Sequence, residues 1–292
     1  MAPSQILNTA PADRRVVIIN EKVTGPVAAE MLRLSTLVDT SIHRQSLEVL
    51  DNATGGGILV SELLKLVSQH SIQPKRIIAG DLDDKMLQAA AQQQSDSIAA
   101  GVTGWQNVEI AKVDQQSLPY PNESLTHLFS NMGIFFCADD HKALTEAHRV
   151  LRPSGQAGFS SWKSIAWWSE VAQPALKAYL PDTPELPSPS GMFPVRGWSD
   201  PEAIIGKLEA AGFVDVEVSE YAFTPVVEAE EFAEATGVLV SIVAKRFWSE
   251  EVFERYAGEV EAALLRYLKE HYEDGRWTGK MTAIISSGRK AS

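Results

Sequence analysis

Three acidic residues in the first half of the chain are candidates for binding a nucleoside-like ligand. Asp51 begins the run "DNATGGG", and Asp81 and Asp114 follow in "AGDLDD" and "AKVDQQ". One carboxylate can accept hydrogen bonds from both hydroxyls of a ribose, and an acid or amide can meet the edge of an adenine. The glycines after Asp51 allow positive φ and let the backbone approach a ligand closely.

The same acids also have a structural interpretation. Taken singly, an aspartate between a strand and a helix is more often an N-cap or a solvated loop residue. A glycine-rich turn between a strand and a helix is equally ordinary. The surrounding elements favour the ligand site, because each of the three acids ends a predicted strand and the three strands are successive.

Predicted strands and helices alternate from about residue 45 to residue 162. Apolar runs predict strands at 46–52, 74–81, 107–114, 124–131 and 156–162. Helical periodicity and breakers predict helices at 24–38, 56–70, 83–101 and 139–155. Alternation of this kind, with strands that are apolar nearly throughout, is typical of a parallel sheet covered on both faces. Such a sheet binds ligands at the carboxyl ends of its strands.

The pattern changes after Trp162. Prolines interrupt the stretch "LPDTPELPSPSGMFP", which we interpret as a loop or cap insertion at 163–200. A helix at 200–213, a strand at 214–223, further helices up to 272 and a last strand at 281–290 then resume the sheet pattern. We expect one domain over 1–292, made of an N-terminal helical segment (1–44), a ligand-binding core (45–162), the cap insertion (163–200) and a C-terminal part that completes the sheet and lid (201–292).

Composition excludes several classes of protein. The net charge of −12 and the absence of any Lys/Arg run longer than two argue against nucleic acid as a partner. Cys137 is the one cysteine, no signal peptide or membrane-length apolar run is visible, and the histidines form no metal-site spacing. We expect a cytoplasmic protein without a metal or membrane partner. Nothing in the sequence indicates an oligomeric state.

Four motifs together resemble those of class I S-adenosylmethionine (SAM)-dependent methyltransferases of the ubiquinone/menaquinone-biosynthesis type. "VLDNATGGG" resembles the family's first motif, hydrophobic–acid–x–Gly–x–Gly–x–Gly, and "AGDLDDKML" resembles its second-strand motif. "VDQQSLPYPNESLTHLFSN" and "ALTEAHRVLRPSG" resemble its adenine-side motif and the helix before its fifth strand. More narrowly, "LDNATGGG", "LTHLF", "FSSW" and "TAIISSG" resemble a group of fungal small-molecule methyltransferases that includes the gliotoxin bis-thiomethyltransferase.

The resemblance implies an α/β fold, a cofactor and a set of cofactor-binding positions. The fold would be a Rossmann-like, doubly wound, mostly parallel sheet of seven strands with a helical and loop cap over the carboxyl ends of the strands. The cofactor would be SAM, and its binding residues would be Asp51, Asn52, Ala53, Gly55, Gly57, Asp81, Leu82, Met86, Asp114, Gln115, Asn131 and Met132.

The chain departs from the family pattern at three places. Ala53 replaces the first glycine of the first motif, Thr126 replaces the acid usual in the fourth strand, and "RRVVIINEKVTG" lacks a tyrosine that often lines the methionine end of the cofactor pocket. A NAD site is the rival interpretation of the glycine turn. An acid beside the turn would repel a pyrophosphate but suits the ammonium of a methionine moiety, which favours SAM.

No general base can be assigned from the sequence. His127 lies in a strand expected to be buried, and His141 and His148 lie on one helix face. Methyl transfer from a sulfonium needs mainly alignment, and a thiol needs little help from a base. We therefore predict a methyltransferase acting on a small-molecule secondary metabolite, by S-methylation in the narrowest form. O- or N-methylation of a small aromatic metabolite stays open, as does a non-methylating cyclase or regulator on the same fold.

Aromatic residues around the cap insertion are the candidates for lining an acceptor pocket, because flat apolar molecules bind to such surfaces. The alternative is that they form a small core of their own. Asn131 is a candidate for orienting the cofactor or acceptor. The candidate pocket residues are Phe135, Trp162, Trp167, Trp168, Met192, Phe193 and Trp198.

Overall fold

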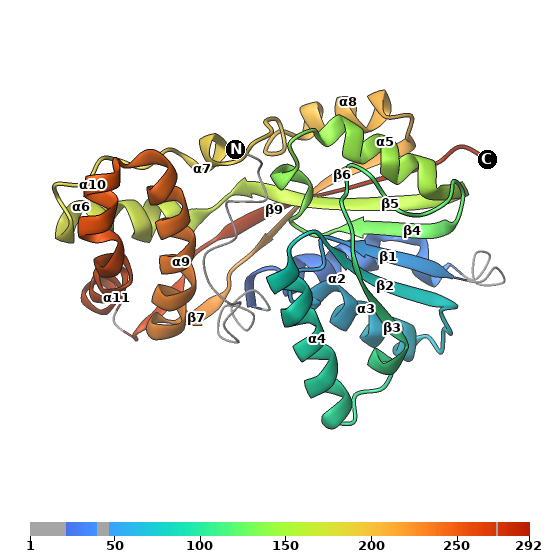
Figure 1. Ribbon diagram of the computed structural model, residues 1–292, viewed down its shortest axis with the longest axis horizontal. Helices are drawn as coiled ribbons and strands as arrows, with labels where there is room; N and C mark the ends of the chain where they lie inside the picture. The colour runs from blue at the N-terminus through green and yellow to red at the C-terminus, as the bar shows by residue number, and fades with distance from the viewer. Residues whose placement is uncertain (1–21, 40–46, 273) are drawn as a thin grey trace.

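The computed structural model describes residues 22–39, 47–272 and 274–292, and it is built around one seven-stranded sheet (Figure 1). The strands lie in the order β3-β2-β1-β4-β5-β9-β6. The first five are parallel, and β9 runs antiparallel to both of its neighbours. The strands are β1 (Glu48–Asn52), β2 (Arg76–Asp81), β3 (Val108–Lys112), β4 (Leu125–Ser130), β5 (Leu151–Ser164), β6 (Val214–Phe223) and β9 (Met281–Arg289). The predicted fold class is confirmed.

The two central strands β1 and β4 are buried along their whole length, as expected for parallel strands covered on both faces, although half or more of their residues are polar. Every residue of β1 and β4 is buried. The polar Thr126 is tolerated in β4 because its hydroxyl donates to the Glu48 carbonyl oxygen at 2.8 Å and accepts the Glu48 N–H at 3.0 Å. A threonine here thus ties β4 to β1 where the family usually has an acid.

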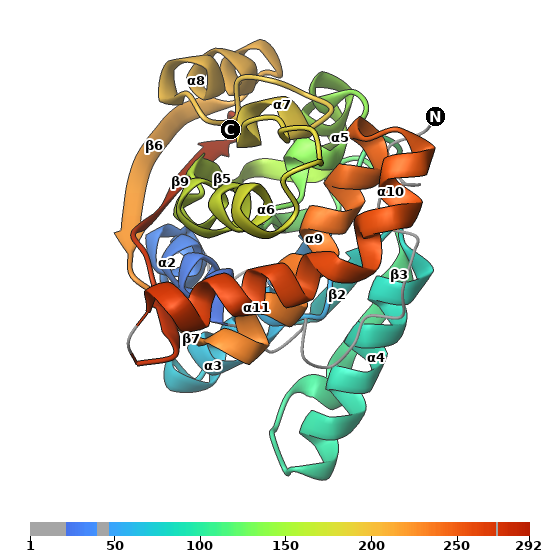
Figure 2. The ribbon, with the colours of Figure 1, turned by 90° about the vertical axis from the view of Figure 1, so that its left-hand side faces the viewer.

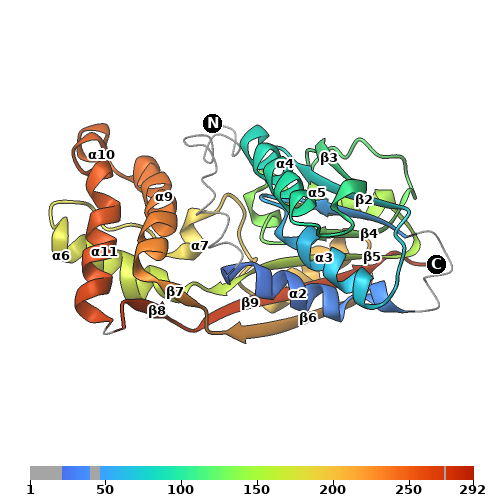
Figure 3. The same cartoon turned by 90° about the horizontal axis from the view of Figure 1, so that it is seen from below.

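Helices cover both faces of the sheet, as a doubly wound fold requires (Figures 1 and 3). α5 and α8 lie on one face, and α2 and α3 lie on the other. Aspartates at three N-caps accept N–H groups of the first turn: Asp83 before α4, Asp139 before α5 and Asp200 before α8. The helices are α2 (Gly25–Leu34), α3 (Ile58–Gln69), α4 (Asp84–Ala99), α5 (Asp140–Val150) and α8 (Pro201–Ala210).

The fifth strand begins earlier than the sequence predicts. We expected a helix over 139–155 that Pro153 and Gly155 end, and a strand only from residue 156, but α5 ends at Val150 and β5 starts at Leu151. The pairing of β4 with β5 shifts register between Leu125 and His127. Pro153 lies at this irregularity, where its lack of an N–H donor does not interrupt a regular ladder of hydrogen bonds.

The chain builds a second hydrophobic core beside the sheet, which we call the cap. Its elements are a π-helix (Trp168–Ala172), α6 (Gln173–Tyr179), α7 (Pro189–Met192), α9 (Ala229–Phe247), α10 (Glu250–Tyr256), α11 (Val260–His271) and the strand pair β7 (Val226–Glu228) and β8 (Arg276–Thr278). Trp168 and Trp277 are its largest fully buried side chains. Figure 2 shows α11 crossing in front of α9, with which it packs. The short pair β7–β8 was not expected, because three-residue strands leave no clear pattern.

Candidate functional site

The turn after β1 crosses the end of β2. The N–H groups of Ala53 and Thr54 donate to the Gly80 carbonyl oxygen at 2.9 and 2.8 Å. Ala53, Gly55 and Gly57 have positive φ, at 79°, 54° and 86°. Two of these positions carry glycine, which adopts this conformation without strain, whereas Ala53 adopts it with a Cβ.

Asp51 is fully buried at the end of β1, and only one of its two carboxylate oxygens accepts a hydrogen bond from the described residues. The Thr54 hydroxyl donates to Oδ2 at 2.6 Å, whereas Oδ1 is buried without a hydrogen-bond partner among the described residues. Burial, together with the nearby charge of Asp81, raises the pKa of Asp51 to about 7 despite the Thr54 hydrogen bond. A buried carboxylate of this kind is costly until a donor or a cation meets it. The amide oxygen of Asn52 is also buried without a partner in the described chain.

Asp81 lies at the end of β2 and holds the glycine turn. Its Oδ2 accepts the Gly55 N–H at 2.9 Å, and its Oδ1 accepts the Asp83 N–H at 3.0 Å. Burial raises the pKa of Asp81 in spite of these two donors. Leu82, the next residue, is 42% exposed, and Met86 lies partly buried in the first turn of α4.

Asp114 and Gln115 follow β3 but differ in what they contact. Asp114 accepts the Gln116 N–H at 2.8 Å and stays beside its own loop. Gln115 reaches towards β4, because its Oε1 accepts the Ser130 hydroxyl at 3.1 Å and its Nε2 donates to the Gly133 carbonyl oxygen at 3.4 Å. These bonds bring the ends of β3 and β4 together.

Asn131 is held in a defined orientation just after β4. Its Oδ1 accepts the Ser160 hydroxyl at 2.7 Å, and its Nδ2 donates to the Thr24 carbonyl oxygen at 3.3 Å. The Met132 N–H donates to the same Ser160 oxygen at 3.0 Å. Ser160 was not predicted from the sequence, although a small polar residue inside a buried strand, in "FSSW", was a signal that could have pointed to it.

Replacing Ser160 by alanine is expected to lower the free energy of unfolding by about 3 kcal/mol, because two buried groups, on Asn131 and Met132, lose their partner. Ser286 on the neighbouring β9 is the matched control. It is equally buried but makes a single 3.3 Å bond, to the Phe159 carbonyl oxygen, so Ser286→Ala should cost about 1 kcal/mol. Urea unfolding of both variants checks this, and equal losses would contradict it.

Gly133 and Ala53 approach each other so closely that only one of them can carry a side chain. A Cβ on Gly133 would lie 2.4 Å from the Ala53 Cβ and 2.8 Å from the Ser130 hydroxyl oxygen. The Ala53 methyl group in the turn after β1 therefore packs directly against the backbone of Gly133 in the segment after β4. This contact fixes Asp51 relative to Asn131.

Gly133→Ala is expected to destabilise the protein by about 2–3 kcal/mol through overpacking. Adding Ala53→Gly should restore part of that loss, because it removes the nearer clash. Gly206→Ala is the control: it lies within α8 with nothing within 4 Å of the added Cβ, and it should stabilise by about 1 kcal/mol. Thermal unfolding of the single and double variants measures the coupling, and strict additivity would rule out the direct contact.

The candidate pocket residues divide between the core of the sheet and the core of the cap. Phe135 packs against Phe193 next to the end of β4, with ring centroids 4.4 Å apart and ring planes tilted by 58°. Trp198 is buried in the sheet core, and its indole N–H donates to Asp140 at 2.8 Å. The others belong to the cap core or its border: Trp162, Trp167, Trp168 and Met192.

Neither His127 nor His148 is placed as a general base. His127 is buried, and its ring nitrogens contact the hydroxyls of Thr36 and Thr126 at 3.1 and 3.2 Å. His148 packs edge-on against Phe213, and burial lowers its pKa. No cluster of three or more His, Cys, Asp or Glu side chains suited to a metal occurs in the part of the chain that the structure describes.

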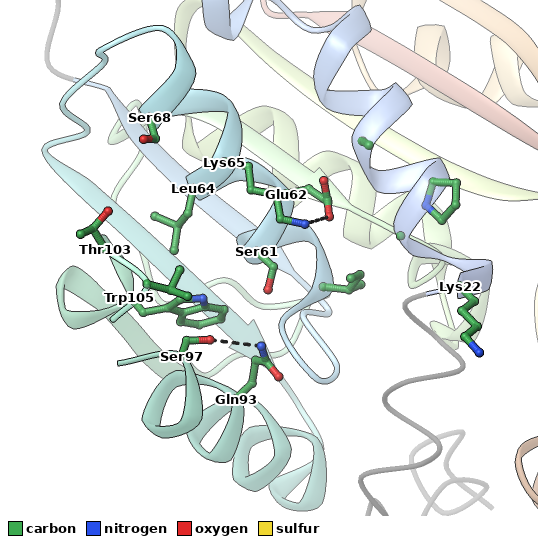
Figure 4. Close-up of a pocket in the computed structure, with 15 residues that line it drawn as sticks. Lys22, Ser61, Glu62, Leu64, Lys65, Ser68, Gln93, Ser97, Thr103 and Trp105 are labelled. Carbon is green, nitrogen blue, oxygen red and sulfur yellow. Dashed lines mark hydrogen bonds and ion pairs between the residues drawn. The ribbon is translucent and has the colours of Figure 1, made fainter. Parts of the chain in front are cut away.

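A hollow of about 630 Å³ lies between α2, α3 and α4, away from these residues (Figure 4). Ser61, Leu64 and Trp105 are among its lining, and its lysines already have partners, Lys65 with Glu62 at 2.7 Å and Lys22 with Glu231. None of the predicted cofactor residues lines it.

The segment 14–25 is the one that lacks the tyrosine often found in the family. Residues 14–21 of this segment lie outside the described residues.

The first five strands of the sheet and the helices between them match a known protein family. A family model described as "Methyltransferase domain" matches residues 50–159, which span β1 to β5 and every predicted cofactor residue. The chain carries a methyltransferase domain. This match confirms the resemblance seen in the sequence.

Two fungal relatives cover almost the whole methyltransferase. The protein is 29% identical to methyltransferase tpcH of Aspergillus fumigatus, over 91% of this chain and 94% of that one. It is 26% identical to the acetylaranotin bis-thiomethyltransferase of Aspergillus terreus, over 86% of this chain and 84% of that one. The protein is a class I SAM-dependent methyltransferase similar to fungal small-molecule methyltransferases.

A solved structure shares the fold of this methyltransferase. Phosphoethanolamine N-methyltransferase 2 of Haemonchus contortus, in complex with phosphomonomethylethanolamine and S-adenosylhomocysteine, superposes with a TM-score of 0.53 at 14% identity. The match covers 100% of this chain and 61% of that one.

Over the described residues, no helix is both long and apolar enough to cross a membrane.

Proposed function

We propose that this methyltransferase binds SAM at the carboxyl ends of β1 to β4 and transfers the methyl group to a small secondary metabolite, with a thiol sulfur as acceptor. The observation that carries the cofactor site is the buried Asp51 oxygen that lacks a partner beside a turn of positive φ. The thiol is supported by the acetylaranotin relative, whose name states bis-thiomethylation.

The residues present fit SAM. Asp51 Oδ1 offers a buried negative charge to the ammonium of the methionine moiety. Asp81 lies where both ribose hydroxyls can reach its carboxylate, and the exposed Leu82 offers an apolar surface beside it. The remaining proposed contacts are Asn52, Ala53, Gly55, Gly57, Met86, Asp114, Gln115, Asn131 and Met132.

When bound, SAM supplies an electrophilic methyl group on a sulfonium. Asp51 holds the ammonium, and Asn131, fixed by Ser160 and Thr24, orients groups beside the methyl. An acceptor aligned with the sulfonium would take the methyl group from its sulfur, and S-adenosylhomocysteine would be the second product. A thiol with a pKa of about 8.5 loses its proton to solvent readily, so the lack of an assigned base is no obstacle. Positioning and exclusion of water then carry the catalysis.

Calorimetric titration tests the cofactor, using SAM, S-adenosylhomocysteine and NADH in separate runs. We expect micromolar affinity for the first two and none for NADH, and the opposite pattern would support a nicotinamide site. Incubation with SAM and small dithiols, followed by mass spectrometry, then tests the acceptor. Methyl gain on a phenol or amine but not on a dithiol would favour O- or N-transfer. SAM binding with rearrangement of a metabolite and no methyl gain would favour a cyclase.

The other partners follow from the same proposal. The acceptor is a small molecule, and no nucleic acid or membrane is involved. The expected location is the cytoplasm, and the candidate acceptor contacts are Phe135, Trp162, Trp167, Trp168, Met192, Phe193 and Trp198.

A further inference from the structure

Helix α9 of the cap carries one face with an apolar centre and charged ends. At helical spacing, Glu231, Ala235, Val238, Leu239, Ile242 and Arg246 share that face. Leu239, near its middle, is 42% exposed, and Val238 and Ile242 are partly exposed. The opposite side of the helix packs on α11, where Gly237 meets Glu261.

Both ends of this face are tied to segments that flank the cofactor site. Glu231 forms an ion pair with Lys22, which lies two residues before Thr24. The Thr24 carbonyl oxygen in turn accepts the Asn131 amide. At the other end, Arg246 donates to the Met192 carbonyl oxygen at 3.1 Å.

The second tie also leads to the end of β4. Met192 precedes Phe193, whose ring packs against Phe135 at 4.4 Å and Phe136 at 5.3 Å. Figures 1 and 3 agree that α9 is on the side of the cap nearer the sheet, with α11 farther out. The face of α9 therefore spans from the start of α2 to the segment after β4.

We infer that the exposed apolar part of this α9 face, Val238, Leu239 and Ile242, is the surface against which the methyl acceptor lies, and that it selects an uncharged, apolar acceptor. The inference rests on the proposed function, whose methyl group would be delivered beside Asn131. It concerns α9 alone, and this helix contains none of the predicted site residues.

The chemistry of the face sets the class of ligand. Its centre offers hydrocarbon and no hydrogen-bonding side chain, so a charged group placed there would lose hydration without compensation. Glu231 and Arg246 are 15 positions apart, which is about 22 Å along a helix. Between these ends, the exposed apolar residues Val238, Leu239 and Ile242 span about 6 Å along the helix, roughly the length of a two-ring molecule.

The test uses two probes that share the naphthalene ring system and differ in charge, 2-naphthol and 2-naphthalenesulfonate, titrated calorimetrically into protein saturated with S-adenosylhomocysteine. We expect the neutral probe to bind at least tenfold more tightly. Leu239→Ser should weaken its binding about tenfold, since part of a leucine's apolar contact is lost, and Ile242→Ser should act in the same direction. The affinity for S-adenosylhomocysteine should not change in either variant.

Val214→Ser is the matched control, because Val214 is also 42% exposed but lies at the start of β6, an edge strand of the sheet, and not in the cap. Failure of 2-naphthol to bind, or equal losses in Leu239→Ser and Val214→Ser, would overturn the inference. The same titrations without S-adenosylhomocysteine separate the two proposals. A Leu239-dependent affinity for 2-naphthol in a protein that binds no sulfur cofactor would refute the proposed function and leave the α9 surface standing.

Discussion

Replacing Asp81 by alanine is expected to weaken SAM binding about a hundredfold or more, because two hydrogen bonds from ribose hydroxyls to a carboxylate are lost together. The Gly55 N–H, which Asp81 accepts at 2.9 Å, also loses its partner, and so the turn is held less firmly. Asp81→Asn keeps one acceptor oxygen and should show an intermediate loss. Calorimetric titration with SAM measures all three proteins.

Asp84→Ala is the control for this prediction. Asp84 lies three residues further on, at the first turn of α4, and its carboxylate pairs with Lys112 at 2.8 Å on the surface. Exposed pairs of this kind contribute little, so the affinity of Asp84→Ala should stay within about twofold of the wild type. An unchanged affinity in Asp81→Ala would show that Asp81 only holds the turn.

Asp51→Asn is expected to make the ligand-free protein more stable and its SAM binding weaker. The pKa of Asp51 is about 7 in the folded protein, raised mainly by burial from the ordinary value of 3.8. The folded state therefore retains a proton that the unfolded state releases. Folding stability falls as pH rises from about 4 to 7, and the loss is complete above pH 7. Within that range, the folded state loses about 1.4 kcal/mol for every increase of one in pH.

Urea unfolding of both proteins from pH 5 to pH 8 checks this, because their difference cancels other groups such as His148, whose lowered pKa acts in the opposite direction. The advantage of Asp51→Asn should grow with pH. SAM affinity should show the reverse pattern. In the wild type it should rise through pH 7 as Asp51 ionises to meet the ammonium, and in the variant it should be weaker and flat. A pH-independent stability difference would contradict the assignment.

The sheet was predictable because burial on both faces leaves a simple trace in sequence. β1 and β4 are short segments with apolar residues at their centres, bounded by turn residues, and the alternation with helices permits few arrangements. β5 was harder, since Pro153 is usually a breaker and here lies within an irregular strand. The π-helix at Trp168–Ala172 was not predicted, because its tryptophans suggest a core or a pocket equally well.

The acids and glycines of the candidate site were predictable from the sequence, but the residues that hold them in place were not. The positions of Asp51 and Asp81 follow from strand ends, which a sequence shows. Ser160 and Gly133 act across strands that are distant in sequence, and only the packed structure reveals the hydroxyl that Asn131 shares with Met132. The α9 face was hidden for a related reason: its role depends on what its two ends contact.

The position of β9 has a consequence for biosynthesis. β9 lies between β5 and β6, yet it is encoded after both of them. While a ribosome is still translating the cap, the nascent chain carries β5 with an unpaired edge and β6 with no neighbour in the sheet. The sheet can close only after residues 281–289 have left the exit tunnel. Until then the chain exposes an apolar edge open to aggregation, and a chaperone that shields nascent strands would determine how much enzyme the cell obtains.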